Sequence, residues 1–385
     1  MEVMPGYKLT EVGVIPDEWA VRSIGQVFRL VNGCAFKPED WKLTGTPIIR
    51  IQNLNDPFAP FNFSQAAVSD KNRVEPGDLL FAWSGTLGSS FGARLWHGPA
   101  GVLNQHIFKV HMADRQITLP FSLLVFARVE EDIATQAHGF KASFVHVKKA
   151  DLVKVWLPVP PLLEQDAIAS VLGDVNALLA GLERLIAKKR DLKRAAMQQL
   201  LTGQTRLPGF QGEWIVKRLG DIAPLQRGFD LPTPVLRPGP YPVVYSNGVL
   251  AHHDSYQARG PGVVTGRSGT IGRVSFIADG PYWPHNTALW VTSFKANDPK
   301  FVFYLYTHIG FERFASGSGV PTLNRNDAHA FEIAVPATKN EQTAIATVLS
   351  DMDAELTALE ARRDKTRALK QGMMQELLTG RTRLV

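Results

Sequence analysis

The chain has 385 residues and a net charge of +6, and 45% of its residues are hydrophobic while 20% are charged. This balance is typical of a soluble globular protein with two or three domains. The single cysteine, Cys34, excludes an intramolecular disulfide and fits a reducing compartment. The longest apolar stretch, residues 119–129, contains Arg128 and is too short to cross a membrane. Since residues 1–13 also lack a secretory signal pattern, we expect a cytoplasmic protein with no membrane partner.

Residues 1–159 are predicted to form a first globular lobe. Runs of β-branched and aromatic residues at 46–51 and 101–110 predict strands, and turn sequences such as Glu75-Pro76-Gly77-Asp78 separate runs of this kind. One helix is expected near residues 119–137. The lobe should therefore be a mixed α/β domain.

A long helix is predicted in residues 160–204. Pro158, Pro160 and Pro161 precede it, where proline is tolerated, and Gly203 can adopt the left-handed cap at its end. The apolar residues have a three-four spacing, which is typical of a helix that packs against another long helix. They are Ile168, Val171, Val175, Leu178, Leu182, Leu185 and Leu192.

Residues 205–335 repeat the style of the first lobe, with strands predicted at 241–245 and 262–265 and a helix near 299–316. A second long helix is predicted in residues 336–385. About 40 residues at ~1.5 Å rise per residue make each long helix roughly 60 Å long. Two such helices pack most simply antiparallel and would hold the lobes apart.

An internal repeat organises the chain. Residues 164–207 and 341–384, offset by 177 positions, are identical at 25 of 44 positions without a gap. The lobes share only short landmarks, such as Ser84-Gly85-Thr86-Leu87-Gly88 and Ser268-Gly269-Thr270-Ile271-Gly272. We predict an α+β fold with an internal pseudo-two-fold repeat. Two mixed α/β lobes would be separated by two antiparallel helices that form a coiled-coil spacer.

The positive charge is concentrated outside the long helices. Residues 162–203 have a net charge of +1 and residues 340–380 a net charge of −2, which leaves +7 for the remainder. This excess is compatible with a polyanionic partner, although many proteins that bind no nucleic acid have a similar charge.

Several motifs occur twice in the same order. They are Leu157-Pro158-Val159-Pro160-Pro161 before Glu164-Gln165, Ala334-Val335-Pro336 before Glu341-Gln342, and the openings Glu18-Trp19 and Glu213-Trp214. Together with residues 317–327, they resemble the specificity subunit of type I restriction–modification systems over essentially the whole chain. One departure is Ala337-Thr338-Lys339-Asn340, a longer junction than its counterpart in the first half.

The resemblance implies a DNA-recognition subunit that has no catalysis and no cofactor or metal of its own. Each lobe would read one half of an asymmetric, bipartite site in double-stranded DNA. The helices would set the separation of the half-sites and dock two modification subunits, which carry S-adenosylmethionine and methylate adenine. Restriction subunits, with ATP and magnesium, would join this complex.

Residues that could contact DNA are polar or basic and lie in predicted loops, where Arg, Asn, Gln, Ser and Thr can reach base edges or phosphates. The candidates are Arg50, Gln52, Asn53, Ser84, Thr86, Asn104, Gln105, His106, Lys141, Ser143, Lys148, Gln226, Arg227, Ser246, Asn247, Arg267, Ser268, Thr270, Asn286, Ser318, Thr322, Asn324 and Arg325. For the Ser-Gly-Thr segments, the simpler interpretation is a tight turn between strands.

Two other classes of function remain as alternatives. One is a stand-alone methyltransferase or nuclease, which the residues disfavour: Asn55-Asp56-Pro57-Phe58 differs from a methyltransferase Asn-Pro-Pro-Phe motif by Asp56, and no phosphate-binding loop is present. His252-His253-Asp254 is expected to be an exposed turn rather than a metal site. The other is a coiled-coil adaptor whose lobes bind proteins instead of DNA.

Overall fold

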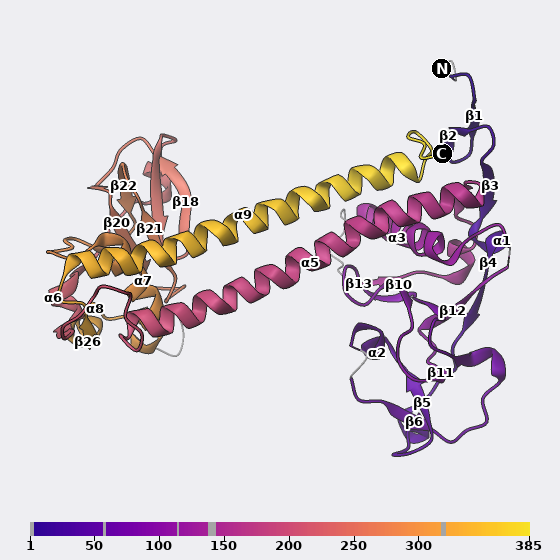
Figure 1. The fold of residues 1–385 in the computed structure, drawn as a ribbon, viewed down its shortest axis with the longest axis horizontal. Helices are drawn as coiled ribbons and strands as arrows, with labels where there is room; N and C mark the ends of the chain where they lie inside the picture. Colours follow the sequence, from indigo (N-terminus) through magenta and orange to yellow (C-terminus); the bar gives the residue numbers. More distant parts are fainter. Residues whose placement is uncertain (1–3, 57–58, 114, 138–143, 317–320) are drawn as a thin grey trace. The chain divides into compact units, whose positions relative to one another are not determined.

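The computed structural model describes residues 4–56, 59–113, 115–137, 144–316 and 321–385 (Figure 1). Its contacts divide the chain into two compact units. Unit 1 contains Met1–Ala180 and Asp364–Val385, and unit 2 contains Gly181–Arg363. Unit 1 therefore combines the first lobe with the start of one long helix, α5 (Leu162–Leu201), and the end of the other, α9 (Lys339–Leu377). Unit 2 combines the second lobe with the end of α5 and the start of α9.

The first lobe is built on two four-stranded sheets. The first sheet is antiparallel, with the order β10-β8-β12-β4, and consists of β4 (Phe28–Asn32), β8 (Leu79–Ala82), β10 (Gly92–Leu95) and β12 (Ile107–Met112). The second sheet has the order β6-β5-β11-β7, with β5 and β11 parallel, and consists of β5 (Thr46–Ile49), β6 (Asn62–Ser64), β7 (Arg73–Val74) and β11 (Gly101–Leu103).

The first lobe also contains short strands and several helices outside these two sheets. The other described elements of the first lobe are β1 (Tyr7–Thr10), β2 (Gly13–Pro16), β3 (Ala20–Ser23), α1 (Ile24–Val27), η1 (Pro38–Asp40), α2 (Ile51–Asn55), η2 (Asp70–Asn72), β9 (Ser84–Thr86), α3 (Leu119–Ala137), β13 (Phe144–His146), α4 (Lys149–Leu152) and β14 (Trp156–Val159). Strand β14 pairs with β3, and β13 pairs with β9.

Strand β8 is buried on both faces and separates two cores. Leu79 and Phe81 belong to a core that also contains Phe121 and Phe126 of α3. Leu80 and Ala82 belong to a core that also contains side chains of the second sheet. Because successive side chains of a strand point to opposite faces, a continuous apolar run is what this position requires. The first lobe thus has three layers: helices, first sheet and second sheet.

The second lobe repeats this layering. Its first sheet has the order β16-β23-β20-β21 and its second the order β18-β17-β22-β19, with β17 and β22 parallel. Its described elements are β15 (Ile215–Arg218), α6 (Leu219–Ile222), β16 (Leu225–Arg227), η3 (Thr233–Val235), β17 (Tyr241–Tyr245), β18 (Gly248–His253), β19 (Ala258–Arg259), β20 (Gly262–Gly266), β21 (Val274–Ile277), β22 (Pro281–Pro284), β23 (Ala288–Val291), α7 (Pro299–Ile309), η4 (Phe311–Phe314), β24 (Ala315–Ser316), β25 (Thr322–Leu323), α8 (Arg325–Ala330) and β26 (Glu332–Val335). Each strand of these two sheets has a counterpart with the same neighbours in the first lobe.

Two predicted elements differ from the structure. The predicted strand at 101–110 is two strands, β11 and β12, because the chain turns at residues 104–106 and passes from the second sheet to the first. The predicted helix at 299–316 ends at Ile309, where Gly310 adopts φ +68° and stops the helix. The predicted helix at 119–137, the strand at 241–245 and both long helices are confirmed.

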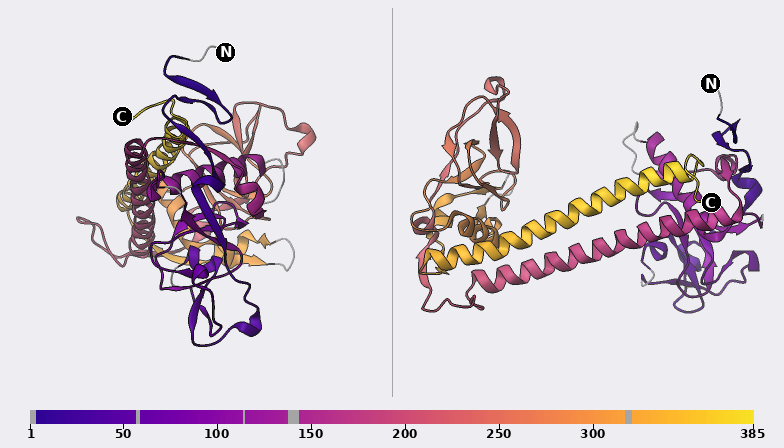
Figure 2. Two further views of the ribbon diagram at one scale, coloured as in Figure 1. Left: turned by 90° about the vertical axis from the view of Figure 1, so that its right-hand side faces the viewer. Right: turned by 45° about the horizontal axis from the view of Figure 1, so that its top comes forward.

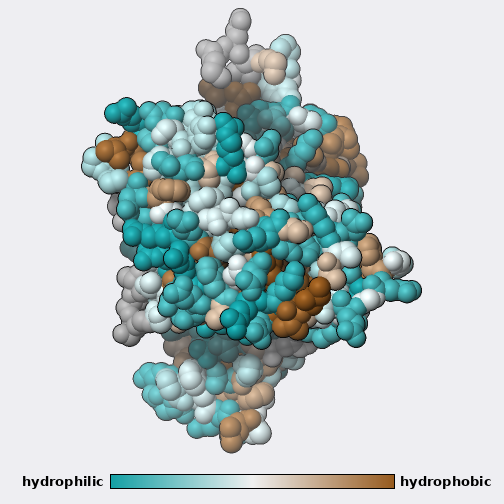
Figure 3. Space-filling view, turned by 90° about the vertical axis from the view of Figure 1, so that its left-hand side faces the viewer, coloured by the Kyte–Doolittle hydropathy of each residue, from teal (hydrophilic) through white to brown (hydrophobic). Residues whose placement is uncertain are grey.

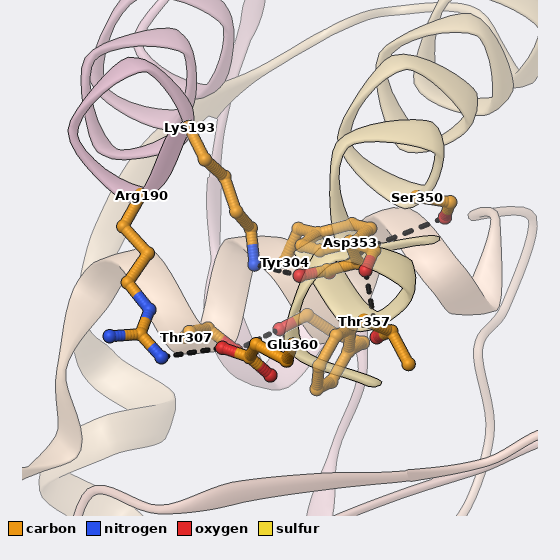
Figure 4. Close-up of polar contacts among 9 residues, drawn as sticks. Arg190, Lys193, Tyr304, Thr307, Ser350, Asp353, Thr357 and Glu360 are labelled. Atoms are coloured by element: carbon orange, nitrogen blue, oxygen red, sulfur yellow. Dashed lines mark hydrogen bonds and ion pairs between the residues drawn. The ribbon is translucent and has the colours of Figure 1, made fainter. Parts of the chain in front are cut away.

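Within unit 2, the end of α5 and the start of α9 run antiparallel (Figures 1 and 2). Lys189 Nζ lies 2.7 Å from a carboxylate oxygen of Glu355, and Arg190 pairs with Glu360. Lys193 pairs with Asp353, whose carboxylate also accepts a hydrogen bond of 2.7 Å from the Tyr304 hydroxyl of α7 (Figure 4). Basic side chains of one helix thus meet acidic side chains of the other, and α7 is tied to the pair.

Equivalent clasps join helix ends to each lobe. In unit 1, the buried Glu164 carboxylate accepts a hydrogen bond of 2.9 Å from Trp19 Nε1 and one of 2.8 Å from Arg383 Nη2. In unit 2, the buried Glu341 carboxylate accepts hydrogen bonds of 3.3 Å from Trp214 Nε1 and 2.7 Å from Arg206 Nη2. We call the sets Trp19–Glu164–Arg383 and Trp214–Glu341–Arg206 the first and second clasp.

The glutamines that follow these glutamates have matching roles. Gln165 donates to the backbone carbonyls of Gln116 and Pro160 and accepts from the Thr118 amide. Gln342 donates to Pro336 O and accepts from the Asp298 amide. The duplicated Glu-Gln pair therefore fixes the start of each long helix to its lobe, because a buried polar group is stable only when it is paired.

The face drawn in Figure 3 is largely hydrophilic, with hydrophobic residues in separate small areas. Among the helices of the described residues, none combines the length and the hydrophobicity that a membrane crossing needs.

Candidate nucleic-acid interface

Three loops of the first lobe meet where its two sheets adjoin. The turn at 104–106 is tied to the second sheet by the Asn104 amide, which donates to Ile49 O at 3.0 Å. The Trp83 amide, which precedes β9, donates to His106 O at 3.2 Å. The Val147 amide, which follows β13, donates to Trp83 O at 2.9 Å. These backbone hydrogen bonds bring four separate parts of the sequence together.

The second lobe has the same three hydrogen bonds at corresponding positions. The His285 amide donates to Val244 O at 2.9 Å, the Arg267 amide to Thr287 O at 2.9 Å, and the Leu323 amide to Arg267 O at 2.8 Å. Trp83 therefore corresponds to Arg267, His106 to Thr287, and Asn104 to His285. These three backbone hydrogen bonds are equivalent in the two lobes, and the side chains at the bonded positions differ.

We call these regions the junction surfaces. The junction surface of the first lobe comprises residues 50–53, 83–86, 104–106 and 144–148, and that of the second lobe comprises residues 245–247, 267–270, 285–287 and 322–325. Most candidates predicted from the sequence fall on them. Gln226 and Arg227 are exposed on β16, next to this region, since β16 pairs with β23 directly after the turn at 285–287.

An aromatic cluster occupies the junction surface of the first lobe. The ring centroid of Trp83 lies 4.6 Å from that of His146 and 5.3 Å from that of His106. Trp83 Nε1 and His106 Nδ1 are buried and have no hydrogen-bond partner among the described residues. Gln105 and Lys148 beside the cluster are exposed, whereas Ser84 is 6% exposed.

The remaining described candidates of the first lobe lie at the start of α2. Arg50 stacks on the Trp41 ring at 4.8 Å and donates to Asn62 Oδ1 at 2.8 Å. Asn53 is fully buried, accepts from the Arg50 amide and donates to Ala59 O, so its side chain shapes the loop and we leave it out of the proposed contacts. Gln52 is exposed.

A charged network borders the junction surface of the second lobe. Arg227 Nη2 donates to Asp230 Oδ1 at 2.9 Å, and the Asn286 amide group donates to the same oxygen. The His285 ring lies 4.2 Å from the Tyr245 ring. Burial lowers the pKa of His285, while a backbone hydrogen bond and the Asp230 charge act in the opposite direction.

Other candidates of the second lobe follow the chain around the same surface. Thr270, Thr322 and Arg325 are exposed, and Asn324 caps α8 by accepting from the Asn326 amide. Arg267, Ser268, Ser246, Asn247 and Asn286 are half-buried, as are Arg50, Thr86, Asn104 and His106 in the first lobe. Lys141, Ser143 and Ser318 lie outside the described residues.

Sequence reasoning missed three residues of these surfaces, namely Trp83, Tyr245 and His285. The signal was available, because Trp83 and Arg267 directly precede the two Ser-Gly-Thr landmarks. The candidates were chosen for their hydrogen-bonding side chains, so the rings of Trp83 and Tyr245 were passed over, although bases stack on aromatic rings.

The sequence around His253 departs from its prediction. His253 is buried rather than exposed, and its Nδ1 lies within hydrogen-bond distance of the backbone N and O of Arg237. Its role is thus to hold a loop against β18. In the part of the chain that the structure describes, no three His, Cys, Asp or Glu side chains gather as metal ligands would.

Comparison with known proteins identifies relatives of the whole chain. Residues 16–189 and 211–367 match the model of the type I restriction modification DNA specificity domain. The type I restriction enzyme MjaVIII specificity subunit of Methanocaldococcus jannaschii is 22% identical over 96% of this chain and 94% of its own length. The EcoBI specificity subunit of Escherichia coli is 26% identical over 53% of this chain and 43% of its own.

A solved structure has the same fold. The S subunit of a type I restriction–modification system from M. genitalium aligns over 97% of this chain and 99% of its own, with a TM-score of 0.61 and 17% identity.

Proposed function

The chain belongs to the family of type I restriction modification DNA specificity domains, and on this premise we propose that it is the DNA-reading subunit of a type I restriction–modification complex. Each lobe would read one half of a bipartite site in double-stranded DNA. The observation that carries this proposal is the pair of junction surfaces, which have equivalent backbone hydrogen bonds but different side chains. Because equivalent positions carry different chemistry, the two half-sites should differ in sequence.

The chemistry of the junction surfaces supports direct contact with bases. Arg, Gln, Asn, Ser and Thr side chains hydrogen-bond to base edges in the major groove, and Lys and Arg contact phosphates. Both surfaces hold exposed or half-buried groups of these types, including Gln105 and Lys148 in the first lobe and Arg267 and Arg325 in the second. The individual contacts remain part of the proposal.

We further propose that the chain has four domains, at residues 1–159, 160–204, 205–335 and 336–385. The second and fourth contain α5 and α9, which would form a coiled-coil spacer between the two lobes. Points that read the same face of B-DNA are about 34 Å apart or a multiple of that distance. A 40-residue and a 39-residue helix are long enough to span such a separation. A packed pair would keep that separation constant, whereas a flexible linker would not.

The exposed sides of these helices would dock two modification subunits, with restriction subunits added to the complex. The chemistry of methylation and cleavage, with S-adenosylmethionine, ATP and magnesium, would belong to those partners. The duplex hides the amino group of adenine that is methylated, so the target base would be flipped into the partner's active site. The chain itself would contribute no catalytic group, and we expect it to act in the cytoplasm.

The test uses the full chain purified in complex with its modification subunit. We expect this complex to bind and methylate one asymmetric, interrupted sequence, with affinity that decreases as salt increases. Genome-wide methylation profiles with and without the gene would identify that sequence. A complex without DNA affinity would instead favour a protein adaptor, and methylation by the isolated chain would favour a stand-alone enzyme. An uninterrupted palindromic site would contradict the assignment of one half-site to each lobe.

A further inference from the structure

Three positions of the junction surfaces combine identical backbone placement with contrasting side chains. The first holds Trp83 in one lobe and Arg267 in the other, and the second holds His106 and Thr287. The third holds His146 and Thr322. Each of these directly precedes the residue, Val147 or Leu323, whose amide donates to the backbone carbonyl of the first position. We call these the three contrast positions.

In the first lobe the contrast positions form a compact ring cluster. Trp83 contacts both imidazoles, with centroids 4.6 Å and 5.3 Å away. The buried Trp83 Nε1 and His106 Nδ1 have no partner among the described residues, although buried polar atoms in folded proteins are generally paired. The cluster therefore holds hydrogen-bonding capacity that the described part of the chain does not use. His146, at 4.6 Å from Trp83, is exposed and covers one edge of the cluster.

In the second lobe the same positions carry one arginine and two threonines, Arg267, Thr287 and Thr322. Arg267 makes one long side-chain hydrogen bond, 3.5 Å to Asn286 O, and no ion pair within the described residues. A guanidinium has five N–H donors in a planar fork, so most of its donors are available. An arginine held by its backbone but not engaged by a carboxylate is suited to a planar acceptor pair such as guanine O6 and N7.

We propose that the three contrast positions determine which bases each lobe selects, with Arg267 reading a guanine in one half-site. The first lobe has no arginine at the equivalent position, and its ring cluster reads its half-site through the exposed imidazole of His146 and the half-buried rings of Trp83 and His106. This inference rests on the proposed function and assigns its specificity to particular side chains.

The first experiment substitutes Arg267→Lys in the full chain, purified with its modification subunit. The complex selects DNA from a library in which each half-site is randomised in turn, and the bound DNA is sequenced. Lysine keeps the charge but loses the fork, so preference for guanine at one position should fall roughly tenfold or more. The other half-site, the affinity for random DNA and its salt dependence should stay unchanged.

Arg218→Lys is the matched control. Arg218 lies in the same lobe on β15, outside the junction surface, where it is exposed and pairs with Glu332 at 3.4 Å. This variant should select the same sequence as the unaltered complex. If Arg267→Lys behaves as Arg218→Lys does, the assignment of Arg267 is overturned.

The second experiment gives the first lobe the side chains of the second, with Trp83→Arg, His106→Thr and His146→Thr combined. The half-site read by the first lobe should acquire a new base preference, while the other half-site stays the same. Should the combined variant fail to fold, as judged by thermal unfolding, Trp83→Phe replaces it, since it keeps an aromatic ring and removes the five-membered part of the indole with its N–H. A folded variant with an unchanged preference overturns the role of the ring cluster.

The two levels of the proposal can be told apart. An unaltered complex that enriches no sequence contradicts the proposed function itself. An unaltered complex that enriches a bipartite site, while the Arg267 and Trp83 variants enrich the identical site, contradicts only the contrast positions.

Discussion

The clasps and the junction surfaces are both duplicated in the chain, but they differ in what is repeated. In the clasps both the backbone and the side chains repeat, so that Trp, Glu and Arg have the same partners in unit 1 and unit 2. In the junction surfaces only the backbone repeats, and Trp83 stands where Arg267 stands in the other lobe. A clasp must fit one fixed partner within its own chain, whereas each junction surface, in the proposed function, fits a different DNA half-site. The comparison separates what holds the lobes from what distinguishes them.

The largest expected effect comes from a buried clasp carboxylate. Glu164→Gln removes the buried carboxylate that Arg383 contacts and leaves Glu18 as the charged partner of Arg383. It should destabilise unit 1 by about 3 kcal/mol, since removing one member of a buried ion pair has costs of this size. Glu341→Gln should destabilise unit 2 similarly, because Arg206 and Trp214 have the same arrangement. Hydrogen exchange measured in peptides of each unit would show faster exchange in unit 1 for the first variant and in unit 2 for the second. Equal changes in both units would contradict separate clasps.

Alanine substitutions of the glycines that follow the two long helices should destabilise the two halves of the chain by different amounts. Both have positive φ, +70° at Gly380 and +73° at Gly203, so alanine should cost about 1–2 kcal/mol at either position. At Gly380 an added Cβ would lie 2.4 Å from Pro16, whereas at Gly203 it would lie 3.3 Å from the Trp214 ring. Gly380→Ala should therefore be the more destabilising variant in thermal unfolding. The reverse order would show that the two helix ends tolerate crowding differently from what their distances indicate.

The ion pairs between α5 and α9 should matter much less than the clasps. Lys189 and Glu355 are partly exposed, and exposed pairs contribute about 0.2–1 kcal/mol. Glu355→Gln should lower the free energy of unfolding by no more than that, and added salt should reduce the difference. Urea unfolding at low and high salt would measure it. A loss as large as that of Glu164→Gln would mean that the ion pairs, and not the clasps, hold the helices.

The smallest expected effect is a pH dependence at a position where the lobes differ. His285 in the second lobe corresponds to Asn104 in the first, and burial lowers the pKa of His285 below 6.5. The unfolded chain then binds the proton first as pH falls, so this histidine contributes stability above pH 6.5 that is lost as pH falls from 6.5 toward its folded pKa.

His285→Asn introduces the residue of the first lobe and should remove this share of the pH dependence. Other histidines contribute equally to both proteins, so the difference between the two unfolding curves isolates His285. Parallel curves from pH 7 to pH 5 would contradict the expected effect.

Sequence reasoning predicted the fold well wherever the signal was local. Prolines before α5, the glycine after it and the apolar spacing placed α5 within a few residues, whereas α9 ends at Leu377, before the predicted bound of 385. The strand prediction at 101–110 was wrong in one respect, because nothing local reveals that residues 104–106 pass between two sheets.

The junction surfaces were predicted in part. Turn residues such as Asn104 and the Ser-Gly-Thr landmarks pointed to loops that the structure brings together. The contact of Trp83 with His146 was missed because it joins residues that are far apart in the sequence, and such contacts depend on the folded sheets. Asn53 was taken as a candidate since asparagine reads bases, but its burial reflects hydrogen bonds within its own loop.

The composition of unit 1 has a consequence for how the chain is made. Unit 2 is one continuous segment, Gly181–Arg363, whereas unit 1 needs Asp364–Val385 to complete its core and its clasp. A ribosome releases the chain from the first residue to the last, so unit 2 has all its residues before unit 1 does. We therefore expect unit 2 to complete its fold before unit 1 does, although the first lobe is synthesised earlier.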